Sequence, residues 1–281
     1  MKTGVLLVAY GASNYRGTDT LKRVQAQAES RFRLPVRWAF TSEALRNRLA
    51  QSRTKSDSVF KALKRMRFER YTHVAVQSLH VIPGQEYEGV AADCEAVRTE
   101  GGLTIAQGAP LLDQDATGAV EGVARLLLEH APGQRKPEDL VLYMAHGSRS
   151  ECGSLYHDLA DALNRLDSSM FLATMVGSRS GGGTAEDGLG MLFPRLLPLR
   201  GRAVWLLPML SLIGRHALSD MAGGEPDSWK SRLEQAGFPC HAELRSLAED
   251  PAFIGAWLDR LECALDGLTQ GRSREYPPCA T

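Results

Sequence analysis

The sequence predicts an α/β protein made of two similar doubly wound parallel-sheet domains with a cleft between them. Three observations lead to this class. Short apolar runs alternate with helix-like segments along the chain, which is typical of parallel βαβ units. The alternation starts again at Leu140, after the proline- and charge-rich stretch APGQRKPED at 131–139. The two halves also carry similar strand-turn segments in the same order.

The first half is expected to contain four strands that alternate with helices. The strand at 4–10 is a continuous apolar run, as expected for a parallel strand covered on both faces. Thr41 and Ser42 are expected to cap a helix whose first turn carries Glu43, because negative charge is favourable there. The other expected strands are 36–40, 73–77 and 103–107, and the other expected helices are 18–32, 56–66, 86–98 and 113–130.

The second half repeats this alternation. Pro208 is expected to end the strand at 204–207, because proline has no N–H to donate to the sheet. Pro194 leaves the end of the helix at 185–196 open. The other expected strands are 140–145, 171–176 and 239–244, and the other expected helices are 153–166, 228–236 and 251–268.

We predict an N-terminal domain at 1–131, joined by the last helix at 251–268, and a C-terminal domain at 138–250. The two halves resemble each other in two places. LLVAYGAS (6–13) is similar to VLYMAHGS (141–148), and VAVQSLHVIPGQEY (74–87) is similar to VWLLPMLSLIGRHA (204–217). We interpret this as a duplicated domain; the alternative is the general likeness of any two strand-turn-helix units.

Composition excludes several classes of protein. The chain has 281 residues, of which 43% are hydrophobic and 23% charged, as in soluble globular proteins. Lys+Arg and Asp+Glu are equal at 33 each, so we expect no nucleic-acid partner. No stretch approaches the roughly 18 apolar residues of a membrane span, and MKTGVLLVAYGAS is not expected to be a signal peptide. We therefore expect no membrane partner and a cytoplasmic location.

The five cysteines do not form a recognisable metal or disulfide pattern. They are scattered, odd in number and without a C-x-x-C pair, so neither a disulfide framework nor a thiolate zinc site is expected. The sequence also lacks the G-x-S-x-G, G-x-x-x-x-G-K-[ST], H-E-x-x-H and G-x-G-x-x-G motifs. We interpret the triple glycine at 181–183 as a flexible loop rather than a phosphate cradle.

Two histidines of the second half carry the candidate chemistry. His146 follows its first strand and His216 follows its third, and ligands of open α/β sheets lie beyond the carboxyl ends of the strands. Two imidazoles at one edge suit cobalt, nickel, iron or zinc, and they also suit proton transfer near neutral pH. A single histidine at a strand end is more often structural. The first half offers Ser13, His80 and Glu86 at its own strand ends.

The chain resembles a known family in five ordered segments: FTSEALRNRL (40–49), QSLHVIPGQEYE (77–88), MAHGS (144–148), PMLSLIGRHALSDMA (208–222) and DSWKSRLEQAG (227–237). These are similar to the anaerobic-type sirohydrochlorin cobaltochelatases, which are class II tetrapyrrole chelatases. The resemblance runs from the first strand to about residue 265. It implies two α/β domains, a macrocycle in the cleft, and ATP-independent insertion of Co²⁺ into sirohydrochlorin on the route to cobalamin.

The resemblance also implies site residues. The family binds metal through two histidines and a glutamate, and the histidines fall on His146 and His216. Gly177 stands where the family has its glutamate, in a strand that usually reads V-E-G/S-Y-P. Either Glu186 or Asp187 replaces that carboxylate, or two imidazoles and water bind the metal weakly. The substrate-binding candidates are Gly11, Ser13, Ser78, His80, Glu86, Gly147, Ser148, Leu212 and Ile213.

Further groups suit the substrate's carboxylates. Backbone N–H groups at 11–13 and 147–148 are candidates, together with four arginines that are equally readable as solvated surface charges: Arg16, Arg149, Arg179 and Arg215. Co²⁺, with Ni²⁺ or Fe²⁺ as alternatives, is expected as substrate metal, and no organic cofactor is expected. The sequence leaves open whether the chain forms a homo-oligomer.

Three functions compete at this stage. The first is insertion of cobalt, or nickel or iron, into sirohydrochlorin. The second is a protein of the same fold that binds a tetrapyrrole or a metal without chelating, which the missing glutamate favours. The third, drawn from the residues without the resemblance, is a two-domain sensor of a small anion. The absence of an expected signal peptide argues against the third function.

Overall fold

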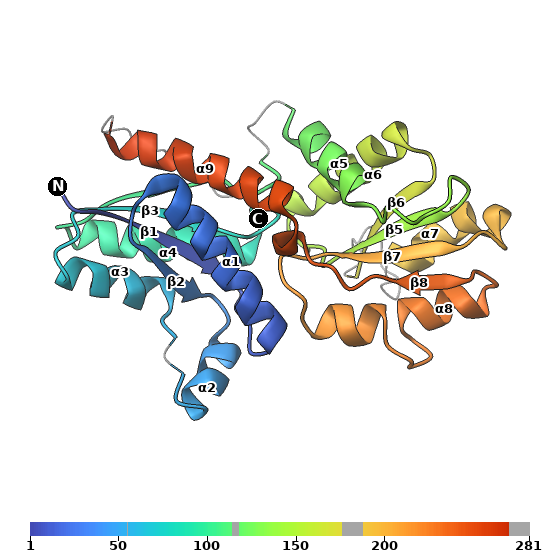
Figure 1. Ribbon diagram of the computed structural model, residues 1–281, viewed down its shortest axis with the longest axis horizontal. Coiled ribbons are helices and arrows are strands. Elements are labelled where there is room, and N and C mark those ends of the chain that lie inside the picture. Colours follow the sequence, from blue (N-terminus) through green and yellow to red (C-terminus); the bar gives the residue numbers. More distant parts are fainter. Residues whose placement is uncertain (55, 114–117, 176–187, 270–281) are drawn as a thin grey trace. The chain divides into compact units, whose positions relative to one another are not determined.

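The computed structural model describes residues 1–54, 56–113, 118–175 and 188–269, which form two compact units (Figure 1). The first unit contains residues 1–113 and the last helix, α9 (Pro251–Thr269). The second contains the described residues from 118 to 250. Each unit has its own four-stranded parallel sheet, so the prediction of two similar parallel-sheet α/β domains is confirmed.

The sheet of the first unit has the strand order β2-β1-β3-β4, and all its pairings are parallel. Asn14 caps the first helix through its side-chain oxygen, which accepts from Gly17 N at 2.7 Å. The elements are β1 (Thr3–Ala9), α1 (Tyr15–Phe32), β2 (Val36–Phe40), α2 (Glu43–Gln51), α3 (Val59–Phe68), β3 (His73–Ser78), α4 (Gln85–Thr99) and β4 (Thr104–Gln107).

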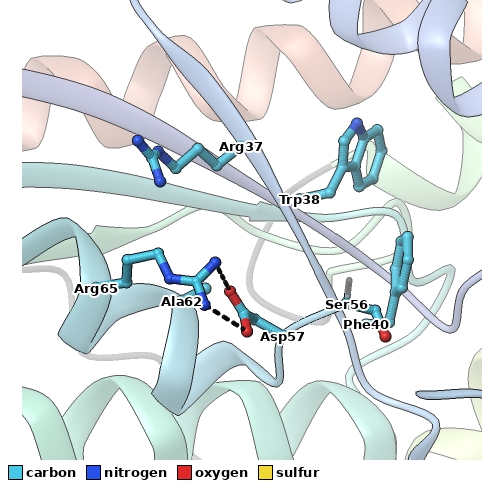
Figure 2. Close-up of a pocket in the computed structure, with 7 residues that line it drawn as sticks. All are labelled: Arg37, Trp38, Phe40, Ser56, Asp57, Ala62 and Arg65. Carbon is cyan, nitrogen blue, oxygen red and sulfur yellow. Dashed lines mark hydrogen bonds and ion pairs between the residues drawn. The ribbon is translucent and has the colours of Figure 1, made fainter. Parts of the chain in front are cut away.

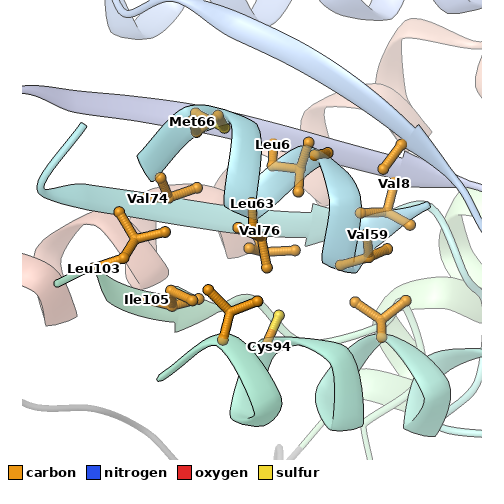
Figure 3. Packing of buried hydrophobic residues seen from close by; sticks show 14 of the residues in the cluster. Leu6, Val8, Val59, Leu63, Met66, Val74, Val76, Cys94, Leu103 and Ile105 are labelled. Carbon is orange, nitrogen blue, oxygen red and sulfur yellow. The ribbon is translucent and has the colours of Figure 1, made fainter. Parts of the chain in front are cut away.

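One core cluster of the first unit lies between its sheet and helices α3 and α4. Alternate strand residues point to this face, among them Leu6 and Val8 from β1 and Val74 and Val76 from β3, as period-two side-chain alternation requires (Figure 3). Leu63 packs on them from α3 and is fully buried. Helix α9 contacts β3 and β4 and contributes no residue to this cluster, so it covers the opposite face.

The sheet of the second unit has the order β6-β5-β7-β8, again with parallel pairings only. A core cluster on one face joins the strands to α7, to α8 and to Met221. The elements are α5 (Ala119–His130), β5 (Leu140–Ala145), α6 (Ser154–Leu166), β6 (Met170–Thr174), α7 (Gly188–Leu196), β7 (Val204–Met209), α8 (Trp229–Gln235) and β8 (Cys240–Ala242). Three short helical turns lie between them, η1 (Glu151–Gly153), η2 (Leu197–Leu199) and the π-helical turn η3 (His216–Met221), and a fourth, η4 (Leu247–Glu249), precedes α9.

The two units share their topology as well as their class. If the four strands of each unit are numbered along the chain, both sheets have the spatial order second, first, third, fourth. Gly11 and Gly147, which each lie two residues beyond the first strand of their unit, both have a positive φ, at 114° and 86°. Glycine reaches this conformation without the Cβ clash that other residues meet, so the same turn follows the first strand of each unit.

The unit boundary differs from the predicted one by one helix. The sequence predicted α5 in the N-terminal domain, but it packs on α6 in the second unit. Tyr143 O–H donates to Leu127 O at 2.7 Å, and the buried His130 Nδ1 bonds to Asp250 Oδ2 at 2.6 Å. The stretch 131–139 therefore lies inside the second unit. The physical reason is that α5 packs on α6 and contacts Tyr143 of β5, both in the second unit.

Pro208 does not end its strand, contrary to prediction. It lies within β7, paired with Met144 of β5. Val204 N and Leu206 O bond towards the β8 side, so the nitrogen of Pro208 points to that side as well. The ladder between β7 and β8 reaches only Leu206, and the proline therefore costs the sheet no hydrogen bond.

Other differences concern boundaries. Helix α1 begins three residues earlier than expected, at Tyr15, and α3 begins three later, at Val59. Pro194 lies inside α7, which continues to Leu196. The cysteines at 94, 152, 240 and 263 are free, and no helix within the described residues is long and apolar enough to span a membrane.

Candidate metal centre

The two histidines follow neighbouring strands. Strands β5 and β7 pair in parallel up to Ala145 and Met209, so they end at the same edge of the second sheet. His146 comes directly after β5, and His216 begins η3 after a short loop that follows β7. Two backbone bonds tie this loop to the rest of the unit, from Leu247 N to Leu210 O and from Ala248 N to Ser211 O.

His146 is oriented by the turn that it begins. Its ring is exposed, and its Nδ1–H donates to Gly147 O at 3.2 Å. Gly147 adopts φ 86°, a left-handed conformation that places its carbonyl within reach of the ring. Ser148, Ser150 and Cys152 then form a chain of side-chain contacts at 2.8 Å between successive groups. This arrangement leaves Nε2 of His146 as the nitrogen with a lone pair.

His216 is oriented by a carboxylate. Its Nδ1–H donates to Asp220 Oδ2 at 2.5 Å, within the π-helical turn η3. Ala217 and Met221 of the same turn are fully buried, whereas His216 is exposed and Asp220 is half-buried. The turn is therefore anchored through Ala217 and Met221, and His216 and Asp220 lie on its outer side. Nε2 is again the nitrogen with a lone pair.

The structure brings the two imidazoles together. Their ring centroids lie 5.2 Å apart with an interplanar angle of 75°. A first-row divalent ion bound at about 2.1 Å to one nitrogen of each ring, in tetrahedral geometry, would set the ring centres about 5 Å apart. The spacing of His146 and His216 therefore fits two ligands of one metal ion.

A third metal ligand is not found in the part of the chain that the structure describes. No group of three or more His, Cys, Asp and Glu side chains is arranged to hold a metal there. Gly177 and its suggested substitutes Glu186 and Asp187 lie outside the described residues. The described site consists of two imidazoles, one of which is bonded to a carboxylate.

The remaining candidates of the second unit lie in the two segments that carry the histidines. Ser148 is half-buried, and its hydroxyl accepts from Ser150 N at 3.2 Å, so it shapes the turn after His146. Leu212 is half-buried and Ile213 is buried at 6% exposure. Arg149 and Arg215 are exposed and adjoin the two histidine turns in sequence, which suits contacts with an anion.

The first unit holds the other candidates, and they are not equally accessible. Gly11 has a positive φ, and a Cβ there would meet Leu45 Cδ2 at 2.2 Å. Ser13 is exposed and precedes the capping Asn14. Ser78 is fully buried, where its hydroxyl accepts from His80 N at 3.5 Å, so it supports the turn after β3 rather than facing solvent.

His80 is the unusual residue of this group. It is only partly buried as a whole, yet both ring nitrogens are shielded from solvent and have no hydrogen-bond partner among the described residues. Burial lowers the pKa of His80 to about 4, against a smaller upward effect of the nearby Glu86 carboxylate. Glu86 itself is exposed in the first turn of α4. His80 is therefore neutral at physiological pH.

A separate cavity of about 240 Å³ lies beside β2 in the first unit (Figure 2). Arg65 Nη1 pairs with Asp57 Oδ2 at 2.7 Å, and Arg37 pairs with both oxygens of Glu69. Since both guanidinium groups already have carboxylate partners, the cavity has no arginine left over for an anion. Its lining residues are Arg37, Trp38, Phe40, Ser56, Asp57, Ala62 and Arg65.

Solved structures with the same architecture define the class of protein. The fold is similar to "SirB from Bacillus subtilis with Fe3+", with a TM-score of 0.61 and 14% identity over 96% of this chain and 98% of that one. It is also similar to CbiX, described as the terminal enzyme for biosynthesis of siroheme in denitrifying bacteria, with a TM-score of 0.53, 16% identity and coverage of 93% and 99%. The chain thus has the two-domain chelatase fold.

Sequence comparison identifies the family within this class. The model of the cobalt chelatase family CbiK matches residues 3–266, so the chain belongs to that family. It is 47% identical to sirohydrochlorin cobaltochelatase CbiKC of Nitratidesulfovibrio vulgaris over 95% of this chain and 92% of that protein. It is 29% identical to sirohydrochlorin cobaltochelatase of Salmonella typhimurium over 95% and 97%.

The sequence analysis missed the residue that orients His216. Asp220 follows His216 at the i, i+4 spacing that places two side chains on the same side of a helical turn. This spacing was the available signal. The chain is π-helical here, however, and a pattern of single residues does not distinguish that turn from an ordinary loop.

Proposed function

We propose that this protein is a sirohydrochlorin cobaltochelatase, which inserts Co²⁺ into sirohydrochlorin without ATP in anaerobic cobalamin biosynthesis. The observation that carries the proposal is the pair of imidazoles, His146 and His216, at 5.2 Å between ring centroids beyond two neighbouring strands. Family membership and the 47% identical cobaltochelatase support the choice of reaction.

The reaction exchanges one metal ion for two protons. Sirohydrochlorin enters with protons on two of its pyrrole nitrogens, and Co²⁺ enters hydrated. The products are cobalt-sirohydrochlorin, two protons and the released water. Charge and atoms balance without a nucleotide or a redox partner.

The histidines can serve both halves of this exchange. Nε2 of His146 and Nε2 of His216 hold the ion and replace part of its water shell. When the ion moves to the macrocycle, each imidazole regains a lone pair and can accept one of the two pyrrole protons. The exposed Arg149 and Arg215 are proposed to contact carboxylates of the substrate.

A second candidate function follows from Gly177. Glycine has no side chain to ligate a metal, and it stands where the family has its glutamate. A two-histidine site holds a divalent ion more weakly than a site with an added carboxylate, because it supplies no negative charge. The protein would then bind a tetrapyrrole or a divalent metal ion without inserting the metal into the macrocycle at a useful rate.

A spectrophotometric assay tests the first function against the second. Purified full-length protein is mixed with sirohydrochlorin and Co²⁺, and the absorbance change of metallation is followed against a protein-free control. We expect a rate above background that His146→Ala and His216→Ala each abolish. A rate equal to background, with tight binding of sirohydrochlorin, would favour the binding protein.

The variant Gly177→Glu adds a sharper comparison. If the missing carboxylate limits the site, we expect tighter Co²⁺ binding and faster metallation in the variant. Thermal unfolding is measured alongside, because glutamate at a position that needs glycine would strain the backbone. A stable variant with unchanged affinity and rate would mean that another acid fills the role or that the alignment of Gly177 is wrong.

Cobalt is the proposed metal substrate, and Ni²⁺ and Fe²⁺ are the alternatives. The same assay with each ion at equal concentration ranks the three metals. A cytoplasmic location and the lack of an organic cofactor stay predictions from the sequence. Whether the chain forms a homo-oligomer stays open.

A further inference from the structure

We propose that Asp220 is the positioning residue of the metal site: it holds His216 in the tautomer that directs the Nε2 lone pair to the metal. The inference rests on the proposed function and extends it to a residue outside the expected ligand set. The carrying observation is the bond from His216 Nδ1–H to Asp220 Oδ2, at 2.5 Å across the π-helical turn η3.

The turn is built to hold this geometry. Its buried row, Ala217 and Met221, packs into the core of the second unit, with Met221 in the main apolar cluster. Gly223 N donates to Ser219 O at 3.0 Å, and a Cβ on Gly223 would approach the same oxygen to 2.3 Å. Glycine is therefore required where the chain leaves the turn.

The exit from the turn is fixed from a second side. The side chain of Ser228, which caps α8 and is almost fully buried, donates to Gly223 O at 2.7 Å. Ser228 Oγ also accepts from Ser231 N at 3.1 Å, as a helix cap. A continuous set of bonds thus runs from the start of α8 to the turn that carries His216 and Asp220.

A role in stability does not account for the pair. His216 and Asp220 are exposed to 47% and 41%, and exposed ion pairs contribute about 0–1 kcal/mol at most. π-helical turns are rare, and they occur frequently at functional sites. The turn and the His216–Asp220 pair are therefore better explained by a role in orienting a metal ligand than by a contribution to stability.

A role as third ligand does not account for Asp220 either. Its side chain is bonded to the δ nitrogen of His216, which lies on the other side of the ring from the metal-facing ε nitrogen. Within the described residues, no three acidic, histidine or cysteine side chains are arranged around one metal position. A carboxylate in this place fixes the tautomer and orientation of the ring and raises its basicity as a ligand.

The two imidazoles differ in this respect. His146 donates to the backbone carbonyl of Gly147 at 3.2 Å, whereas His216 donates to a charged carboxylate at 2.5 Å. A charged acceptor makes the shorter and stronger bond. Asp220 therefore supplies negative charge next to a site whose family glutamate is replaced by Gly177, and its removal should matter more than in a site that keeps the glutamate.

The test combines a tautomer measurement with metal binding. Long-range ¹H–¹⁵N spectra of the full-length protein report which ring nitrogen of His216 carries the proton, and His216→Ala assigns the signal. Calorimetry with Co²⁺ alone measures affinity. Three variants are compared with wild type: Asp220→Ala, Asp220→Asn, and Glu225→Gln, which removes one exposed negative charge from the following loop as a matched control.

We expect wild type to carry its proton on Nδ1. In Asp220→Ala the proton should shift towards Nε2, and Co²⁺ affinity should fall about 10- to 100-fold. Asp220→Asn keeps an oxygen that accepts from Nδ1–H, so it should retain the tautomer and lose less affinity. It also keeps the test informative if the alanine variant does not fold. Glu225→Gln should match wild type.

The outcomes separate the two proposals. Wild-type affinity and an unchanged Nδ1–H in a folded Asp220→Ala variant would overturn the positioning role and leave the proposed metal site intact. Wild-type Co²⁺ affinity in His216→Ala would overturn the metal site itself. Loss of Co²⁺ affinity in His216→Ala and in Asp220→Ala, with the tautomer shift in Asp220→Ala, supports the metal site and the positioning role.

Discussion

His80 is expected to make the first unit sensitive to acid, and the structure gives the size of the effect. Both of its ring nitrogens are buried without a hydrogen-bond partner among the described residues, and burial lowers its pKa from 6.5 to about 4. A charged imidazole in this place would be poorly solvated. The fold therefore favours the neutral ring, and the unfolded chain takes up a proton first as the pH falls.

The sign and window follow from this difference. Above pH 6.5 the ring is neutral in both states, so His80 adds no pH dependence. Between 6.5 and about 4 only the unfolded chain binds the proton, and the free energy of unfolding falls by about 1.4 kcal/mol per pH unit. The total loss is about 3 kcal/mol, and most of it is reached near pH 4.5.

The assay compares wild type with His80→Gln, which fills a similar volume and does not titrate. Denaturant unfolding at about pH 7 and pH 4.5, monitored through hydrogen exchange of the β3 amides, measures the stability of the first unit. We expect wild type to lose about 2–3 kcal/mol more than the variant. His130 has a pKa lowered mainly by burial and adds a loss of the same sign in the second unit, so only the difference between the proteins isolates His80.

Two comparisons guard this interpretation. His157→Gln, on the exposed face of α6, should keep the pH dependence of wild type. Glu86→Gln removes the carboxylate that raises the pKa of His80, so the loss should extend to lower pH. An equal loss of stability in wild type and His80→Gln would refute the reasoning and would mean that the imidazole finds a partner or solvent in solution.

The remaining predictions concern the second unit. Gly147→Ala should weaken Co²⁺ binding about tenfold, because a φ of 86° strains alanine by about 1–2 kcal/mol and the carbonyl that orients His146 would move. Calorimetry measures the Co²⁺ affinity, and an unchanged affinity would contradict the role of that carbonyl. Tyr143→Phe should lower the free energy of unfolding by about 1–3 kcal/mol without changing Co²⁺ affinity, because it removes the hydrogen bond to Leu127 O that holds α5 in place. Equal stability of the variant and wild type in urea would contradict this role.

The sequence predicted the sheets better than the boundaries. Continuous apolar runs such as 4–10 and 140–145 became central strands, because a strand covered on both faces must be apolar on both. Capping residues were also readable, since Ser42 accepts from Leu45 N as expected. Pro208 was misread, because the cost of a proline depends on which neighbouring strand its nitrogen faces, and local sequence does not show that.

The partition of the helices was harder to predict. Helix α5 follows β4 in the chain, yet it packs with α6 and Tyr143 of the second unit. Its apolar face could be buried against either sheet, and sequence periodicity reports only that such a face exists. At the candidate metal centre, strand order alone brought His146 and His216 to one edge, whereas the Asp220 bond depends on the π-helical turn.

The duplication separates what the fold provides from what the side chains provide. Both units end their first and third strands side by side, and both turn after the first strand at a glycine with positive φ. In the first unit the residue before that glycine is Tyr10, exposed to 57%, where the second unit has His146. Glu86 stands where the second unit has His216. The scaffold therefore builds the same edge twice, and only the second edge carries an imidazole pair.

This asymmetry fixes the expected stoichiometry. If the edge of the second unit alone binds cobalt, calorimetry should give one Co²⁺ per chain, and His146→Ala alone should abolish binding rather than halve it. Tyr10→His adds one imidazole to the first unit, but both ring nitrogens of His80 are buried there and Glu86 supplies no second ring. It should therefore leave the stoichiometry at one. A second bound ion in wild type would mean that the first edge also holds metal and that the division of labour between the units is wrong.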